Sequence, residues 1–487
     1  MKKTLLFLVA LLLPLALAAK TTVIYHTSDT HGFYYPKNGQ GGFAALKAVL
    51  NQEKLPYLLL DSGDFANGTV EAKNSKGLKS VVLMNAVGYQ ASTIGNHEFD
   101  FKDPAVEPMI KAAKFPILAA NFYERKTDQL PPLVRPYEIY NVGGVKYAVI
   151  GMANNGPTNP TKQYKFKKDA KILKETLKKV EAENPDVIVL LDHNSIQDDK
   201  HGSDSGLLKL ATKEPGKIDI VLGGHAHKII QNHHEKGTLF VESGCYTQNV
   251  SKITVETDDK TGKFVSAKSE LIPLIVAQTG EDAAVAALAD QLREPGVDDK
   301  VGEATALMSK NPVVKNHKDS PLNDWIADFC RRYAGTEIFI HNNGGTRVDM
   351  EKGPVTRRDI IDIHPFDNYI TKVTVSGKFL KNFVKKSLLP RSLYTYSGMT
   401  VTYKRKGNKV KDLKILVDGK PVENKKTYTI ATNSYIAGGG SEGWMFKQIP
   451  DSQKEQIGSK TIRDLMEEEL VKNSPVAPGP TGRIIEF

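Results

Sequence analysis

The chain has 487 residues, of which 40% are hydrophobic and 25% charged, and its formal net charge is +10. This is the composition of a globular protein with room for two or three domains, and it excludes large-scale disorder. The basic residues are scattered in short runs such as 165–168 and 404–406, which indicates solvated faces. A nucleic acid polymer is therefore not an expected partner.

Residues 1–18 have the pattern of a secretory signal peptide. Two lysines precede an apolar run at 5–17, and the sequence Ala-Leu-Ala at 16–18 supplies the small residues of a cleavage site. The run is short for a bilayer span and contains Pro14. We therefore predict cleavage after Ala18, a periplasmic or secreted location, and no stable membrane insertion afterwards.

Five strand-like apolar runs, at 23–28, 58–60, 91–94, 187–191 and 218–222, are each followed by polar residues. Open α/β sheets bind ligands at the carboxyl ends of their strands, so these polar residues are expected on one edge of a sheet. Carboxylate, imidazole and amide groups together suit divalent ions such as Zn, Mn or Co, and seven are too many for one ion. We therefore predict two divalent metal ions that share a carboxylate, with the candidate ligands Asp29, His31, Asp64, Asn96, His193, His225 and His227.

Helical stretches alternate with these strands, which favours an α/β domain over 19–276. We predict helices at 43–52, 79–87 and 168–183, a hairpin turn at 141–146, and further antiparallel strands over 247–273.

An alanine-rich helical stretch at 281–294 ends at Pro295-Gly296 and is placed in a linker over 277–300. The remainder, 301–487, begins a new pattern of strands and helices. It includes a helix at 321–332 and a strand at 337–340 that leads into a glycine turn bordered by an amide and a guanidinium. Such a turn can hold a polar ligand, and arginine is suited to bidentate contact with phosphate or carboxylate. We predict substrate contacts from Asn342, Gly345 and Arg347.

The ordered motifs resemble those of the calcineurin-like metallophosphoesterases, which read D-x-H, G-D, G-N-H-[DE], H and G-H-x-H. Within them the chain resembles the two-domain 5′-nucleotidase and UDP-sugar hydrolase family, because Gly-Asn-His-Glu-Phe-Asp stands at 95–100 and a second domain follows. The resemblance implies a four-layer α/β-β-α metallophosphoesterase domain followed by an α/β substrate-binding domain. It also implies a catalytic dyad of His97 and Asp100. One ion would be held by Asp29, His31, Asp64 and His227, and the other by Asp64, Asn96, His193 and His225.

The chain departs from the family pattern at three places. Residues 192–195 read Asp-His-Asn-Ser where relatives usually have Ser-His-Leu-Gly. The arginine-rich stretch of relatives is replaced at 316–324, where Lys318 is the nearest basic residue to their arginine. The glycine motif at 439–444 is one residue longer. Phe366 and Trp444 fall where the family carries its stacking aromatics, with Tyr435 as an alternative to Trp444.

These expectations define a function. The first hypothesis is an exported 5′-nucleotidase, in which a water activated between the two ions attacks phosphorus in line. The alternatives are a nucleotide-sugar diphosphatase, a cyclic-nucleotide phosphodiesterase or a sulfur-ester hydrolase on the same centre, and a non-catalytic secreted binding protein. The oligomeric state stays open. Cys245 and Cys330 fall in different predicted domains, so no disulfide between them is expected.

Overall fold

The computed structural model describes residues 19–154, 156, 158, 160–196, 207–388, 394–407 and 409–487. The predicted signal peptide therefore lies outside the described residues. The chain forms two compact units, one made of Met1–Asn67 with Asn74–Arg293 and the other of Gly68–Lys73 with Glu294–Phe487. Among the described residues, no helix is both long and apolar enough to cross a membrane.

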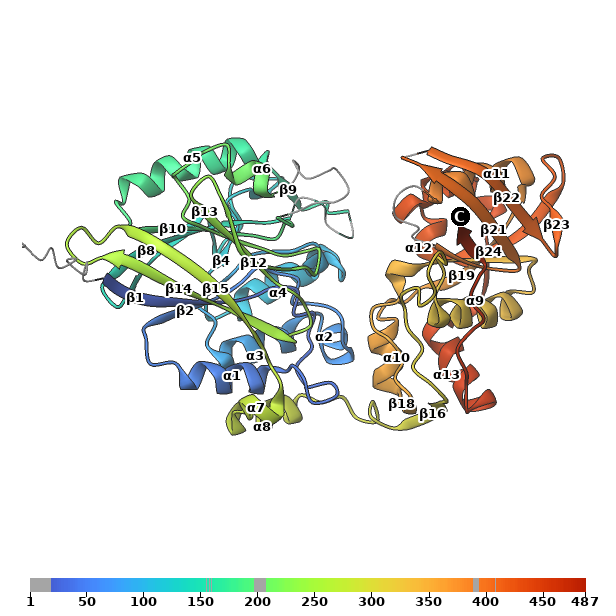
Figure 1. The fold of residues 1–487 in the computed structure, drawn as a ribbon, viewed down its shortest axis with the longest axis horizontal. Helices are drawn as coiled ribbons and strands as arrows, with labels where there is room; N and C mark the ends of the chain where they lie inside the picture. Colours follow the sequence, from blue (N-terminus) through green and yellow to red (C-terminus); the bar gives the residue numbers. More distant parts are fainter. Residues whose placement is uncertain are drawn as a thin grey trace, which may run out of the picture. The chain divides into compact units, whose positions relative to one another are not determined.

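The first unit contains two large sheets (Figure 1). The first has the order β15-β14-β1-β2-β3-β4-β6. Its strands β1, β2, β3, β4 and β6 are parallel, and β14 and β15 extend it in antiparallel register. Their bounds are β1 Ala19–Thr27, β2 Tyr57–Asp61, β3 Ala91–Ser92, β4 Ile117–Leu118, β6 Val134–Arg135, β14 Asn249–Asp258 and β15 Phe264–Pro273.

The second sheet has the order β12-β13-β11-β10-β8-β7. Its four central strands are parallel, whereas β7 and β12 at the two edges are antiparallel to their neighbours. The bounds are β7 Tyr137–Val142, β8 Val145–Met152, β10 Val187–Asp192, β11 Ile220–Gly223, β12 Ile229–Glu235 and β13 Thr238–Ser243. A separate pair joins β5 (Phe122–Glu124) to β9 (Tyr164–Phe166).

Alternating side chains of the second sheet decide how the layers pack. Val189 and Leu191 face the first sheet and join a core with Ile24 and Leu60, whereas Leu190 faces outward and packs with helix α5. The two sheets therefore form the inner layers and helices the outer ones. The helices of this unit are α1 Phe43–Gln52, α3 Leu78–Val87, α4 Asp103–Ala112, α5 Asp169–Ala182, α6 Leu207–Ala211, α7 Val276–Thr279 and α8 Ala283–Gln291. The short helix α2 (Val70–Asn74) belongs, up to Lys73, to the second unit.

The second unit is built on a five-stranded sheet of order β20-β17-β24-β19-β25 and a four-stranded sheet of order β23-β22-β21-β26. A third pair joins β16 (Lys300–Ala304) to β18 (Gly353–Thr356). The other bounds are β17 Ile338–Asn342, β19 Tyr369–Ser376, β20 Tyr394–Ser397, β21 Met399–Lys406, β22 Lys409–Val417, β23 Lys420–Pro421, β24 Thr427–Asn433, β25 Glu455–Thr461 and β26 Ile484–Glu486.

Helices cover both faces of the five-stranded sheet. On one face Phe339 and Ala431 pack with α9, α10 and α13. On the other, Ile338 and Ile430 pack with α11 and with the four-stranded sheet. The helices are α9 Pro321–Ala334, α10 Arg357–Ile363, α11 Gly377–Ser387, α12 Ser434–Ala437 and α13 Ile462–Asn473.

The mixed α/β fold class is confirmed, with a layered first domain and a second α/β domain. The hairpin at 141–146 is present, because Val142 pairs with Val145 across Gly143 and Gly144, both of which have positive φ. The predicted strand at 91–94 shortens to β3, with Thr93 and Ile94 outside it. Cys245 and Cys330 form no disulfide and lie in different units. Cys245 is half-buried and Cys330 is buried.

Candidate metal centre

The seven predicted ligands follow strands of the first unit at their carboxyl ends. Asp29 and His31 follow β1, Asp64 follows β2, Asn96 follows β3, and the histidines follow or end β10 and β11. Five of the seven have positive φ, a conformation that is uncommon outside glycine; these are Asp29, His31, Asp64, His225 and His227. Backbone strain of this kind concentrates at functional sites, where the surrounding fold holds it in place.

Two histidines are oriented by backbone carbonyls. The Nδ1 atom of His31 lies 2.6 Å from the carbonyl oxygen of Asn67, and Nδ1 of His193 lies 2.5 Å from that of Ser62. A carbonyl can only accept a hydrogen bond, so the proton of each neutral ring is assigned to Nδ1. Nε2 then carries a lone pair, which is the arrangement found in metal-binding histidines.

These lone pairs face carboxylates and one another. His193 Nε2 lies 3.0 Å from Asp64 Oδ2 and 3.9 Å from Asp29 Oδ1. His31 Nε2 lies 3.1 Å from His227 Nε2, which is 3.5 Å from Asp29 Oδ1. Three neutral rings and two carboxylates at these distances repel one another unless protons or cations neutralise them. All five are buried or half-buried, so the residues fit a site for divalent cations.

Three groups of side chains are close enough to hold an ion, and they overlap at shared residues. The groups are Asp29 with His31 and His227, His31 with Asp64 and His97, and Asp64 with His193 and His225. Asp64 belongs to the second and third groups, whereas the first group does not include it. Asn96 joins the third group through its Oδ1 atom, 2.8 Å from His225 Nδ1.

The second of these groups adds His97, which the sequence assigns to catalysis rather than to metal binding. Its Nδ1 lies 2.7 Å from Asp100 Oδ2, which also accepts a hydrogen bond from Asn67 Nδ2 at 2.6 Å. Thr158 donates to the other oxygen of Asp100. Burial alone would raise the pKa of Asp100, but the charge of His97 and these hydrogen bonds hold that pKa below its usual range. Asp100 is therefore an ionised carboxylate that orients His97.

Glu98 is a positioning residue that our sequence analysis missed. Its buried carboxylate accepts four backbone N–H groups, two of which belong to Asp64 (3.1 Å) and Gly95 (2.7 Å), so it joins the loops after β2 and β3. The other two are those of Phe65 and Ala66. The sequence signal was the acidic side chain directly after His97. A charged group is costly to bury in an apolar environment, so a carboxylate at such a position indicates hydrogen-bond partners.

Residues 192–195, where the sequence departs from the family pattern, form a hydrogen-bond network with their neighbours. Asp192 Oδ1 accepts from both the backbone N and the side-chain Nδ2 of Asn194, at 2.8 and 2.7 Å. Asn154 Nδ2 donates to Asn194 Oδ1 at 3.0 Å, and Ser195 donates to the buried Glu242. The unusual residues thus have partners, and His193 keeps its place beside Asp64.

The predicted substrate contacts of the second unit start at the end of β17. Asn342 is buried and its Oδ1 accepts from Asn433 Nδ2 at 2.6 Å. Gly345 is packed so that an added Cβ would lie 3.4 Å from both Asn342 Nδ2 and His364 Nε2. The backbone N of Arg347 donates to Ile363. The turn is therefore tightly held by neighbours.

The two predicted stacking aromatics make separate contacts among the described residues. Phe366 is half-buried and its ring meets that of His364 edge-on, with centroids 5.9 Å apart. Trp444 is 40% exposed, with the Lys386 ammonium 4.1 Å from its ring centroid. Tyr435 is 47% exposed and follows Ser434, whose hydroxyl accepts from the backbone N of Tyr369.

Comparisons with known proteins give the class of the protein. Residues 22–228 match the calcineurin-like phosphoesterase family, and residues 300–448 match the 5′-nucleotidase C-terminal domain. The chain therefore belongs to the metal-dependent phosphoesterases. Within them it belongs to the two-domain 5′-nucleotidase and UDP-sugar hydrolase family, which confirms the resemblance seen in the sequence.

Individual relatives cover most of the chain at low identity. Protein UshA of Yersinia enterocolitica is 27% identical over 476 residues, which make up 86% of this chain and 85% of that protein. Endonuclease YhcR of Bacillus subtilis is 26% identical over 89% of this chain, which spans only 37% of that protein's length. The 5′-nucleotidase precursor of Thermus thermophilus has the same fold, with a TM-score of 0.84, 23% identity, and coverage of 96% of this chain and 99% of that one.

Proposed function

We propose that the protein is an exported phosphohydrolase with two divalent metal ions that releases phosphate from nucleoside 5′-monophosphates. The observation that carries this proposal is the set of histidine lone pairs and carboxylates gathered on Asp64 at the strand ends. The family of the chain and its relatives named 5′-nucleotidase support the reaction class. Export is a prediction from residues 1–18, which lie outside the described residues.

The residues of the chain divide the chemistry between them. Asp29, His31, Asp64 and His227 would hold one ion, and Asp64, Asn96, His193 and His225 the other. Two bound divalent ions supply an activated water and draw negative charge from a phosphoryl group.

His97 would act on the phosphoryl group and the leaving group of the substrate. Asp100 stabilises the protonated imidazole through Nδ1, so Nε2–H can donate to a phosphoryl oxygen or to the departing alkoxide. Asn67 and Thr158 keep Asp100 in place for this task. Side-chain nucleophiles are not required, so we expect no covalent phosphoenzyme.

The substrate would be held by the second unit. Asn342, Gly345 and Arg347 would bind polar groups of the nucleotide, and Phe366 with Trp444 would stack on the base. The alternatives that share this metal centre are a nucleotide-sugar diphosphatase, a cyclic-nucleotide phosphodiesterase and a sulfur-ester hydrolase. They differ from the first proposal in the bond that is cleaved: a diphosphate bond, a cyclic phosphodiester, or an ester of sulfur in place of phosphorus.

The test is phosphate release from a panel of nucleotides after chelation and add-back of Zn, Mn or Co. We expect activity to be lost on chelation and restored by at least one metal, with a nucleoside 5′-monophosphate among the best substrates. Asp64→Ala should lose both metal and activity, whereas His234→Ala, a substitution of an exposed histidine in β12, should keep both. Full activity with both metals in Asp64→Ala would exclude Asp64 as a shared ligand.

A further inference from the structure

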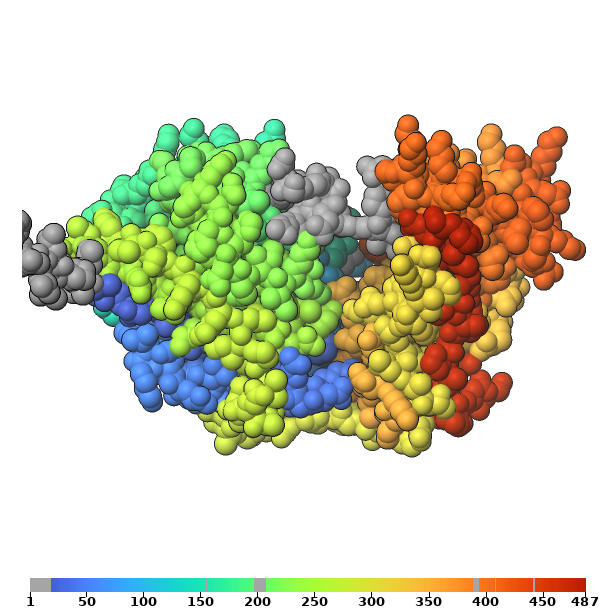
Figure 2. Space-filling model, in the orientation of Figure 1, coloured from blue at the N-terminus to red at the C-terminus, as the bar shows by residue number. Residues whose placement is uncertain are grey.

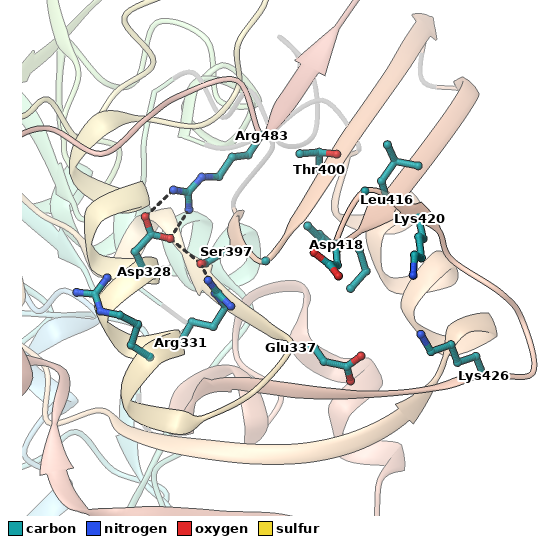
Figure 3. Close-up of a pocket in the computed structure, with 15 residues that line it drawn as sticks. Asp328, Arg331, Glu337, Ser397, Thr400, Leu416, Asp418, Lys420, Lys426 and Arg483 are labelled. Atoms are coloured by element: carbon teal, nitrogen blue, oxygen red, sulfur yellow. Dashed lines mark hydrogen bonds and ion pairs between the residues drawn. The ribbon is translucent and has the colours of Figure 1, made fainter.

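The second unit contains a charged pocket at the end of β17 opposite to the Asn342 turn. The cavity has a volume of about 780 Å³ and includes Glu337, which precedes β17, and Ser397, which ends β20 (Figure 3). Glu337 and Asn342 are five positions apart in the sequence, which is roughly 16 Å along an extended strand. The pocket is therefore distinct from the substrate contacts proposed above.

The backbone itself shapes this pocket. Strand β20 belongs to the five-stranded sheet and β21 to the four-stranded one, and Gly398 is the single residue between them. Gly398 has φ of 82°, and an added Cβ would overlap the carbonyl oxygen of Glu337 and lie 3.1 Å from Arg331 Cδ. Only glycine allows this close crossing, so the pocket is a fixed feature of the place where the chain changes sheets.

One wall of the pocket holds an ordered ion-pair network. Arg483 binds Asp328 through two nitrogens, at 2.7 and 2.9 Å, and thereby neutralises it. Ser397 Oγ donates to Asp328 at 2.6 Å and accepts from Arg331 Nε at 2.8 Å. This arrangement uses Nε and fixes the plane of the Arg331 guanidinium (Figure 3). Its two terminal nitrogens make no hydrogen bond or ion pair with other described residues, so they are oriented donors.

The other wall presents lysines. Lys420 and Lys426 lie together on the far side of the pocket in Figure 3. Within the parts of the chain that the structure describes, neither has an ion pair with a carboxylate, although Lys426 lies 5.1 Å from the ring centroid of Tyr428. Two ammonium groups on one wall and a guanidinium on the other create a positive potential between them.

We propose that this pocket binds a phosphate-bearing small molecule, of the class of sugar phosphates or nucleoside phosphates. Arg331, Lys420 and Lys426 would hold the phosphate, because guanidinium and ammonium groups make charge-assisted hydrogen bonds to it. The carboxylates of Glu337 and Asp418, which also line the cavity, would accept hydrogen bonds from sugar hydroxyls. A cavity of this volume is in the range of small-molecule sites.

The proposal is tested by hydrogen exchange of the intact protein with inorganic phosphate as the probe. Phosphate should slow amide exchange in peptides that cover 396–400 and 415–428, and sodium chloride at equal ionic strength should not. Exchange near the metal centre is recorded in the same experiment, so binding there is separated from binding in the pocket. Absence of local protection, or equal protection by chloride, would overturn the proposal.

Matched variants identify the cations. Titration of phosphate, followed by the protection of these peptides, should show about tenfold weaker binding in Lys426→Gln and in Arg331→Gln. Lys425→Gln is the control, because Lys425 is also exposed and adjacent in sequence but does not line the cavity. Lys426 is exposed, so its variant keeps the fold even if Arg331→Gln disturbs the Asp328 network. Identical affinities in Lys426→Gln and Lys425→Gln would exclude Lys426 as a phosphate ligand and overturn the proposed lysine wall.

Discussion

His97 is either a metal ligand or a catalytic proton donor, and one substitution distinguishes the two roles. It lies within reach of His31 and Asp64 as a possible ligand, yet its Nδ1 is hydrogen-bonded to Asp100 as in a catalytic pair. We expect His97→Ala to lower kcat by roughly 10²–10⁴ and to leave metal content unchanged, since a proton donor would be lost. Elemental analysis and steady-state kinetics measure both, with His234→Ala as the control. Loss of one ion per chain would instead make His97 a ligand.

Asp324 should make the stability of the second unit depend on pH. It is buried in α9, its two carboxylate oxygens have no hydrogen-bond partner among the described residues, and Arg483 Nε is 3.7 Å away. Burial raises the pKa of Asp324 from 3.8 to about 9, although Arg483 opposes this and Asp319 adds to it. The folded chain thus keeps a proton that the unfolded chain loses, and stability falls as pH rises from about 4 to about 9.

The substitution Asp324→Asn removes this titration. Urea unfolding should show that the variant gains more stability over the wild type at pH 8 than at pH 5, by at most about 1.4 kcal/mol per pH unit. Asp328→Asn is the contrasting variant, because it breaks a bidentate pair with Arg483 and should destabilise at both pH values. An equal effect of Asp324→Asn at pH 5 and pH 8 would show that Asp324 is ionised in the folded protein.

The candidate ligands could be predicted because each stands within five residues of the end of an apolar run, so chain position alone assigned them to strand ends. Glu98 could not, since its role depends on amide groups from the loop after β2, 32 to 34 residues earlier in the chain. The same holds for the lone pairs of His31 and His193, which are oriented by distant carbonyls. Contacts between residues that are far apart in the chain cannot be predicted from a local sequence pattern.

The loop after β3 leaves no room for a larger residue at Gly95. A Cβ at this position would overlap the Asp64 carboxylate. Gly95→Ala should therefore displace Asp64 and weaken metal binding by 10-fold or more, as disturbed supporting contacts do at metal sites. Metal content measured after dialysis against graded chelator tests this. Gly156→Ala is the control, because its Cβ would only meet the flexible end of Asn154, and unchanged metal retention in Gly95→Ala would contradict the prediction.

Trp444 and Tyr435 are the two candidates for the aromatic side chain that stacks on the base together with Phe366. Trp444 is predicted from its place in the glycine motif, but Lys386 already lies over its ring. Tyr435 is the second residue of α12, and the hydrogen bond between Ser434 and Tyr369 brings that helix to the start of β19, three residues after Phe366. The extra residue in the motif at 439–444 explains why sequence position alone could not choose between them.

Kinetics decides which aromatic stacks. Replacing the residue that stacks on the base opposite Phe366 by Ala should raise KM for nucleotides about tenfold or more. The same substitution should have little effect on KM for an aryl phosphate, which has no base. We expect this of Trp444→Ala from the motif, and Tyr435→Ala is the matched comparison. Equal damage to both substrates would indicate lost folding, and an effect confined to Tyr435→Ala would move the clamp to that residue.

The division of the chain into two units, each with its own hydrophobic clusters, predicts how metal removal acts on the whole molecule. The candidate ligands all belong to the first unit, and ions that bind only the folded state stabilise it by about 4 kcal/mol at a thousandfold excess over Kd. Chelation should therefore lower the midpoint of one calorimetric transition, on the order of 10 °C, and leave the other unchanged. In Asp64→Ala the midpoint of the first unit's transition should already be lower than in the wild type and should not respond to chelator. His234→Ala should behave as the wild type. A single transition that shifts as a whole would show that the two units unfold together despite their separate cores.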